Sequence, residues 1–200
     1  EDTLSLHDAL PIFQALSVSQ AKALSSTQVN ALTSAQFKQL STSAVAALAS
    51  DRIVNLTTEL VAAITTDQMQ ALTTSQIANL SSSQLAKLTT SAVGVMSAAQ
   101  IKAIDSASID DLTTDQVRVI RADAVAGLSS AQISQLVATS QVKALTTAQV
   151  NALSSAQLKA LDSTQMSNMT TSQVSAINAL QVKGIDSEDL NRSEEHTSEL

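Results

Sequence analysis

The chain lacks cysteine, tryptophan and tyrosine, and its 200 residues include one proline, three glycines and two phenylalanines. Without cysteine there is no disulfide and no thiol chemistry. Tryptophan and tyrosine are the residues most typical of interface hot spots, and both are absent. The two histidines, His7 and His196, lie near the ends, so residues 13–191 have neither His nor Cys to bind zinc. No phosphate-binding loop or nucleophile motif occurs. We therefore expect no enzyme activity and no catalytic, cofactor or metal site.

The two ends differ in pattern from the rest of the chain. TLSLHDALPI, residues 3–12, and RSEEHTSEL, residues 192–200, match translated short-read sequencing adapters letter for letter. We interpret residues 1–12 and 192–200 as adapter-derived, and residues 13–191 as a fragment of a longer array. Without these ends, 12 acidic and 10 basic residues remain. This balance does not indicate nucleic acid as a partner. Because no apolar run approaches the roughly 18 residues of a membrane helix, no membrane insertion is expected.

What the chain does contain is an eight-residue repeat, and LTTAQVNAL, residues 145–153, is a typical example. A leucine-class residue recurs every eight residues from Leu16 to Leu136. One nine-residue unit follows, residues 137–145, and the eight-residue spacing then continues as far as Ile185. The chain thus contains 21 units. Self-similarity at a fixed period is typical of solenoids and other arrays.

Each octad carries a helix-start signal. Its first residue is usually Ser, Thr or Asp, and in most octads Gln stands three residues later, as in Thr33 and Gln36. Ser/Thr-x-x-Gln is a capping box, in which the two side chains bond to each other's backbone N–H. Two apolar anchors three residues apart follow, such as Val29 and Leu32, and this spacing places them on one helical face. We predict an all-α solenoid, or superhelix, of about 20 very short helices, one per octad.

The predicted packing follows from the length of the octad. An isolated helix of seven residues is unstable in water, so the octads must stack with their anchors in a shared interior. The anchors expected to be buried include Val150, Leu153, Leu158 and Leu161. Apolar interior should remain exposed at both ends of the array. Alanine often precedes the second anchor, where a small side chain would let a neighbouring helix approach.

The alternative fold is one long continuous helix or coiled coil. Eight residues advance an ideal helix by about 800°, so the leucine stripe would drift by about 80° per octad and no seam would persist. The nine-residue unit would rotate everything after it by about a further 100°. In a chain of separate short helices, we expect the extra residue to be absorbed at a junction between helices.

The phrase LTTAQVNAL resembles the "LTTAQVAAL" repeat tracts of large bacterial surface or secreted proteins. Such proteins often carry labels such as haem utilisation or adhesion. The similarity extends from Ser17 to about Ile185 and is specific for the type of repeat, not for an activity. Between residues 13 and 191, the candidate axial ligands for haem are four methionines at apolar octad positions, which we interpret as core residues. These are Met69, Met96, Met166 and Met169.

The densest charge lies in IDSASIDDLTTDQVRVIRAD, residues 104–123. One interpretation is a calcium or polar-ligand site. The other, which we favour, is a solvated stretch with ordinary i,i+3 pairs such as Asp115 with Arg118. Several octads lack the usual Gln, and we interpret these replacements as repeat drift. They include Arg52, Leu60, Ala92, Ser108 and Ala124. The Asn-x-Ser/Thr triplets at Asn55, Asn79 and Asn168 follow from the octad pattern.

The uniformity of the octads favours a non-enzymatic structural or spacer array within a large bacterial exported or surface protein. An extracellular or cell-surface location is therefore expected. The alternative is a repeat-based, adhesin-like binding module that uses one face of the superhelix for a protein or glycan partner.

Overall fold

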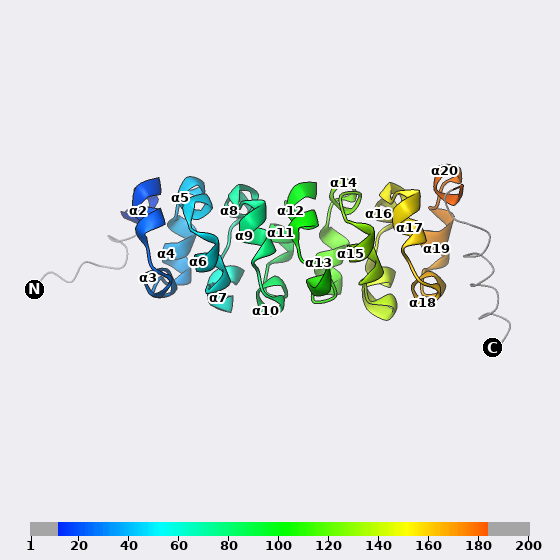
Figure 1. Ribbon diagram of the computed structural model, residues 1–200, viewed down its shortest axis with the longest axis horizontal. Helices are drawn as coiled ribbons and strands as arrows, with labels where there is room; N and C mark the ends of the chain where they lie inside the picture. Colours follow the sequence, from blue (N-terminus) through cyan, green and yellow to red (C-terminus); the bar gives the residue numbers. More distant parts are fainter. Residues whose placement is uncertain (1–11, 184–200) are drawn as a thin grey trace, which may run out of the picture. The chain divides into compact units, whose positions relative to one another are not determined.

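The computed structural model describes residues 12–183, which contain only helices and connecting turns, with no strand. The chain divides into two compact units, one ending at Met96 and the other beginning at Ser97. Each unit is built from short helices joined by brief turns (Figure 1). The all-α array of short helices predicted from the sequence is confirmed.

The helices follow the octads one by one. In the first unit they are α2 (Val18–Ala23), α3 (Ser26–Asn30), α4 (Ser34–Gln39), α5 (Thr42–Ala47), α6 (Ser50–Val54), α7 (Thr58–Ala62), α8 (Thr66–Ala71), α9 (Thr74–Ala78), α10 (Ser82–Leu85) and α11 (Thr90–Gly94). In the second unit they are α12 (Ala98–Ala103), the 3-10 turn η1 (Ser106–Ser108), α13 (Thr114–Val119), α14 (Ala122–Val125), α15 (Ser130–Ser134), the π-turn η2 (Ala138–Val142), α16 (Thr147–Ala152), α17 (Ser155–Lys159), α18 (Ser163–Ser167), α19 (Thr171–Ser175) and α20 (Ala179–Val182).

Helix α16 illustrates how an octad starts and ends a helix. Thr146 has extended backbone angles (φ −75°, ψ 158°), and its hydroxyl accepts a hydrogen bond from the Gln149 N–H at 3.2 Å. The Gln149 side chain accepts in turn from the Thr146 N–H at 2.7 Å. At the other end, Leu153 returns to an extended conformation (ψ 140°), and the next cap residue follows at once. The alternative of one continuous helix is therefore wrong, because the chain leaves the helical conformation at every octad boundary.

The cap at Thr146 gives a direct test of this local structure. We expect Thr146→Ala to lower the free energy of unfolding by about 1 kcal/mol, because it removes the acceptor for an N-terminal N–H. Thr147 is the matched control, since it is the first helical residue and is exposed. Thr147→Ala should change stability by at most a few tenths of a kcal/mol, because alanine is a better helix former than threonine. Chemical denaturation measures both values. Equal effects of the two substitutions would contradict the assignment of the cap.

The nine-residue unit differs from expectation in where it takes up its extra residue. Instead of lengthening a junction, it forms the π-turn η2, in which the Val142 N–H bonds to the Val137 carbonyl five residues back. The side chain of Gln141 still reaches the Val137 N–H, now four residues away, at 2.9 Å. Single-turn π-bulges are the usual result of a one-residue insertion in a helix. The insertion lies here because Gln141 keeps its bonds to the Val137 N–H and to the carbonyls of Ile109 and Leu112.

Deleting Ala138 should restore an ordinary octad. We expect the free energy of unfolding to stay the same or rise slightly, because all later octads keep their contacts. The matched control is deletion of Ala148 from the regular octad that begins at Thr146, which moves Gln149 out of register. That deletion should cost at least about 2 kcal/mol, as expected when a buried hydrogen-bond network is broken. Denaturation midpoints distinguish the two deletions. A larger loss from removing Ala138 would show that the chain is not built from separable octads.

Within each unit, every helix packs against the helix three octads away, which produces three rows. In the first unit the rows are α2–α5–α8–α11, α3–α6–α9 and α4–α7–α10. In the second they are α12–α14–α16–α19, η1–α15–α17–α20 and α13–η2–α18. Figure 1 shows α2, α5 and α8 following one another along one edge of the first unit. Polar side chains reinforce this packing, as where the Asn151 amide donates to the Ala176 carbonyl at 3.0 Å.

The apolar anchors form the interior, as predicted. Val150 and Leu158 are 0% and 1% exposed, and Leu153 and Leu161 are also buried. Near the two ends of the described array the same positions are less covered. Leu16, Leu24 and Leu32 are only half-buried, while Val174 is 50% exposed.

Gly127 marks a close approach between two helices of one row. It occupies the octad position before the second anchor, where alanine is common. A Cβ built on it would lie 2.8 Å from the Ala98 Cβ and 3.1 Å from the Ala98 carbonyl oxygen. The expectation that small residues here let a neighbouring helix approach therefore holds at this position.

Candidate functional site

The most regular polar feature of the array is the octad glutamine, and Gln149 shows what it does. Its side-chain oxygen accepts from the Thr146 N–H at the start of its own helix. Its amide nitrogen donates to two carbonyl oxygens of a distant octad, Val117 at 2.8 Å and Ile120 at 2.6 Å. The side chain is 1% exposed. One buried amide therefore serves the N-terminus of one helix and the C-terminus of another.

The same pair of acceptors recurs along both units. In each case the amide donates to the first anchor and to the second anchor of the octad four units earlier, at 2.6–3.2 Å. The donors are Gln68, Gln76, Gln84, Gln132, Gln141, Gln149, Gln157, Gln165, Gln173 and Gln181. The last carbonyls of a helix have no partner within it, and this amide supplies one.

The two sets of contacts define the superhelix. Rows join octads three apart, whereas the glutamine amides join octads four apart. One turn of the superhelix within a unit, which we call a coil, therefore holds more than three and fewer than four octads. An α-helix behaves in the same way: residue i lies next to residues i+3 and i+4 because one turn holds 3.6 residues. The glutamines link each coil to the next.

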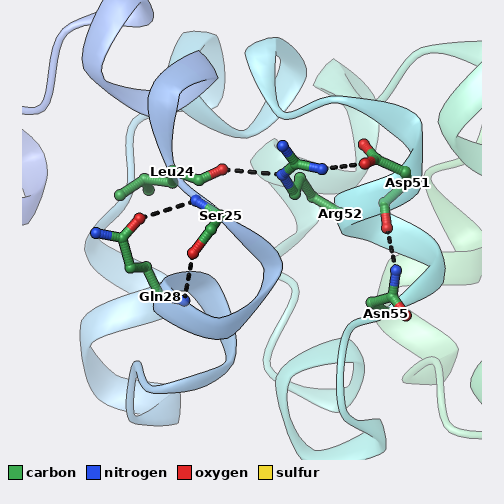
Figure 2. A network of polar contacts seen from close by, with 6 residues as sticks. All are labelled: Leu24, Ser25, Gln28, Asp51, Arg52 and Asn55. Carbon is green, nitrogen blue, oxygen red and sulfur yellow. Dashed lines mark hydrogen bonds and ion pairs between the residues drawn. The ribbon is translucent and has the colours of Figure 1, made fainter.

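The first glutamines provide an internal comparison. Gln20, Gln28 and Gln36 form the same capping boxes as the later ones. Figure 2 shows this box for Ser25 and Gln28, with the amide nitrogen directed away from it. Gln20 and Gln28 are exposed and Gln36 is half-buried, since no octad lies four units before them within the described residues. Burial of the glutamine thus depends on a preceding coil, not on the capping box.

The second role explains why the residue is glutamine. A capping box accepts Glu as readily as Gln, because only an acceptor oxygen is needed. Donation to two carbonyls requires an amide, because a carboxylate has no N–H to give. Glutamate occurs at this position in none of the 21 units. The choice of Gln over Glu is the sequence signal for the contact between coils.

Arg52 replaces the glutamine in one octad and keeps half of its function (Figure 2). Its Nε donates to the Leu24 carbonyl at 2.9 Å, 28 residues earlier, the same relative position that the glutamines use for their second acceptor. A guanidinium cannot accept a hydrogen bond, and Ala49 at the helix start has no side-chain cap. Asp51 pairs with the outer face of the guanidinium. Drift alone is therefore the wrong interpretation of this replacement, because Arg52 links two coils.

The charged stretch from residue 104 to 123 does not gather its acidic side chains. Asp115 pairs with Arg118 at 3.2 Å, which confirms the expected i,i+3 contact. Arg121 bonds Asp123 through two nitrogens, at 3.0 and 3.1 Å. Nowhere between residues 12 and 183 do three or more Asp, Glu, His or Cys side chains come together in a group that could hold a metal ion. The stretch thus contains two local ion pairs, Asp115 with Arg118 and Arg121 with Asp123.

The methionines considered as haem ligands lie mostly in the interior. Met69, Met96 and Met169 are buried, while Met166 is half-buried. They occupy anchor positions or adjoin them, so their side chains pack with the other anchors.

No helix in the described part of the chain has the length and apolar character needed to cross a membrane.

Among the carboxylates of residues 12–183, Glu59 is the one whose environment clearly lowers its pKa. Hydrogen bonds from its own backbone N–H and from the Thr57 side chain at the start of α7 are the main causes. Because the folded pKa lies below the unfolded one, Glu59 stabilises the fold above its ordinary pKa, and this contribution is lost as the pH falls. We expect Glu59→Gln to flatten the pH dependence of stability in the acidic range. Denaturation midpoints measured from acid to neutral pH would show this, and an unchanged profile would contradict it.

Comparison with known families finds a similar repeat in two stretches of the chain. The model of the ALTTAQ repeat matches residues 61–98 and 138–171. No match was found among curated proteins, nor among solved structures. The adapter-like ends lie outside the described residues, apart from Ile12. The chain thus contains a repeat region that is similar to the ALTTAQ repeat in these two stretches.

Proposed function

We propose that this chain is a non-enzymatic structural or spacer array from a large bacterial exported or surface protein. The observation that carries the proposal is where the recurring polar groups are used. The cap hydroxyls bond to the helix starts, and the glutamine amides bond between coils inside the array. In the inner coils, the polar groups that most octads share are therefore used by the fold itself rather than presented to a ligand.

The contact pattern also suits a part whose length can vary. Helices pack against helices three octads away, and most glutamines of the inner coils bond to the octad four units earlier. In such arrays stability is a sum over neighbours, so units can be added or lost without new kinds of contact. A spacer needs this property, whereas an active site needs a few privileged residues.

The exported location rests on the resemblance of LTTAQVNAL to repeats of bacterial surface and secreted proteins. The absence of cysteine is compatible with it. An extracellular or cell-surface location is therefore part of the proposal.

Two measurements on the parent protein test it. An epitope inserted after Ser154, in the turn before α17, should be accessible to antibody on intact cells. Deletion of one octad, residues 154–161, should leave surface display and the functions of the flanking regions intact. Detection of the epitope only after lysis would contradict export, and hydrolytic or redox turnover by the purified chain would contradict a structural role. Saturable binding of the chain to one glycan or protein, abolished by exposed substitutions, would replace the spacer with an adhesin-like binding module.

A further inference from the structure

The two ends of the described array carry complementary surfaces. At one end, the amide nitrogens of Gln20, Gln28 and Gln36 have no acceptor among the described residues, although their capping boxes are complete. These donors stand at the octad position from which glutamines of the inner coils reach back to an earlier coil, as Gln68 does to Phe37 and Leu40. We call them the donor end.

The other end carries the matching acceptors. The last described glutamines, Gln173 and Gln181, donate to carbonyls as far along the chain as Leu153. The next anchor pairs, beginning with Leu158 and Leu161, receive no glutamine amide from the described residues. These anchor carbonyls have the spacing that inner coils use. We call them the acceptor end.

Apolar surface accompanies the polar groups at both ends. Leu16, Leu24 and Leu32 are half-buried at the donor end, although the corresponding inner anchors are buried. At the acceptor end Val174 is 50% exposed and Val182 is 46% exposed. Solenoids usually need end repeats with a polar outer face to stay soluble. Here the end octads have the same sequence pattern as the inner ones.

We propose that the donor end of one copy of this chain docks on the acceptor end of a second copy. The new interface repeats the contact between two inner coils, with Gln20, Gln28 and Gln36 donating to anchor carbonyls of the partner. Within residues 12–183 charge does not oppose it, because acidic and basic residues are nearly balanced there, whereas the full chain has a net charge of −7. The contact is heterologous, so each copy keeps one free end and larger assemblies can follow. In a longer chain, octads of the same polypeptide would occupy these surfaces.

The first experiment measures the mass of the full 200-residue chain by sedimentation over a wide concentration range. We expect a concentration-dependent rise from monomer to dimer and larger species. The variant Gln20→Glu, Gln28→Glu keeps the capping boxes but removes two of the three donors, and it should remain monomeric and folded. The control Gln70→Glu, Gln135→Glu adds the same charge at exposed positions outside the capping boxes and should associate normally. A monomeric parent chain, or equal association of both variants, would overturn the proposal.

The second experiment tests the direction of docking. A variant blocked at the acceptor end, Val174→Lys, Val182→Lys, should also be monomeric. Mixed with the variant blocked at the donor end, it should form a dimer that grows no further, because each variant retains one working end. Failure of the mixture to form dimers, with both variants folded by circular dichroism, would contradict head-to-tail docking. So would growth of the mixture beyond the dimer.

Discussion

Replacing Gln149 by glutamate should destabilise the array by about 3–5 kcal/mol at neutral pH, although glutamate is a normal member of a capping box. The carboxylate would lie buried against the carbonyl oxygens of Val117 and Ile120, which now receive the amide at 2.8 and 2.6 Å. Both hydrogen bonds would be lost, and a negative charge would face two acceptors without a partner. Chemical denaturation followed by circular dichroism measures the loss.

The matched control is Gln28→Glu. Gln28 has the same capping box but is exposed and has no carbonyl acceptor among the described residues. A carboxylate near a helix start is favourable, so stability should change by no more than about 0.5 kcal/mol. A similar loss in both variants would mean that the capping box, not the link between coils, sets the need for glutamine.

The pH dependence of the Gln149→Glu variant gives a second check. Burial against two carbonyl oxygens should raise the pKa of the new carboxyl above its unfolded value. The penalty is therefore fully expressed above the folded pKa and disappears as the pH falls below the unfolded pKa. In acid, the protonated carboxyl can donate one hydrogen bond to a carbonyl. Partial recovery of stability in acid, relative to the parent chain, is expected, and a pH-independent loss would contradict burial of the charge.

Truncating the first anchor, Val150→Ala, should lower the free energy of unfolding by roughly 2–3 kcal/mol, because Val150 is fully buried among the anchors of the coils. Val174→Ala is the matched control: the same residue at the same octad position, but 50% exposed. It should cost less than about 1 kcal/mol, since less apolar surface is removed from contact. Denaturation midpoints of the two variants give the comparison. Equal losses would show that octad position alone, without coil packing, determines the contribution of an anchor.

The local features of the fold could be predicted from the sequence because their signals lie within one octad. A hydroxyl, a Gln three residues later and two apolar residues three apart specify a short helix and its buried face. This holds at Thr146, Gln149, Val150 and Leu153. The extra residue of the unit 137–145 was visible too, but its location was not. Gln141 bonds both to the Val137 N–H at the start of that unit and to the carbonyls of Ile109 and Leu112, so the extra residue lies between Val137 and Gln141, within the helix.

The closure of the coil could not be predicted in the same way. All octads look alike, so nothing in Gln149 indicates that its partners are 29 and 32 residues earlier rather than in an adjacent octad. The absence of glutamate from this position in all 21 units, where it would serve the capping box equally well, was a usable signal for a second role. Arg52 was a second signal of this kind. Its long side chain can donate hydrogen bonds, and it stands in an octad whose first residue, Ala49, has no side-chain cap. Neither the absence of glutamate nor Arg52 says which octad is the partner. That becomes clear only from the structure, where the neighbouring coil is seen.

The central claim is that buried glutamine side chains hold successive coils together. Hydrogen exchange of glutamine side-chain amides, followed residue by residue by NMR, tests it most directly. The amide protons of Gln149 should exchange at least about 100-fold more slowly than those of Gln28, because only the former are bonded inside the array. Equal, rapid exchange of both side chains in the folded protein would contradict the account.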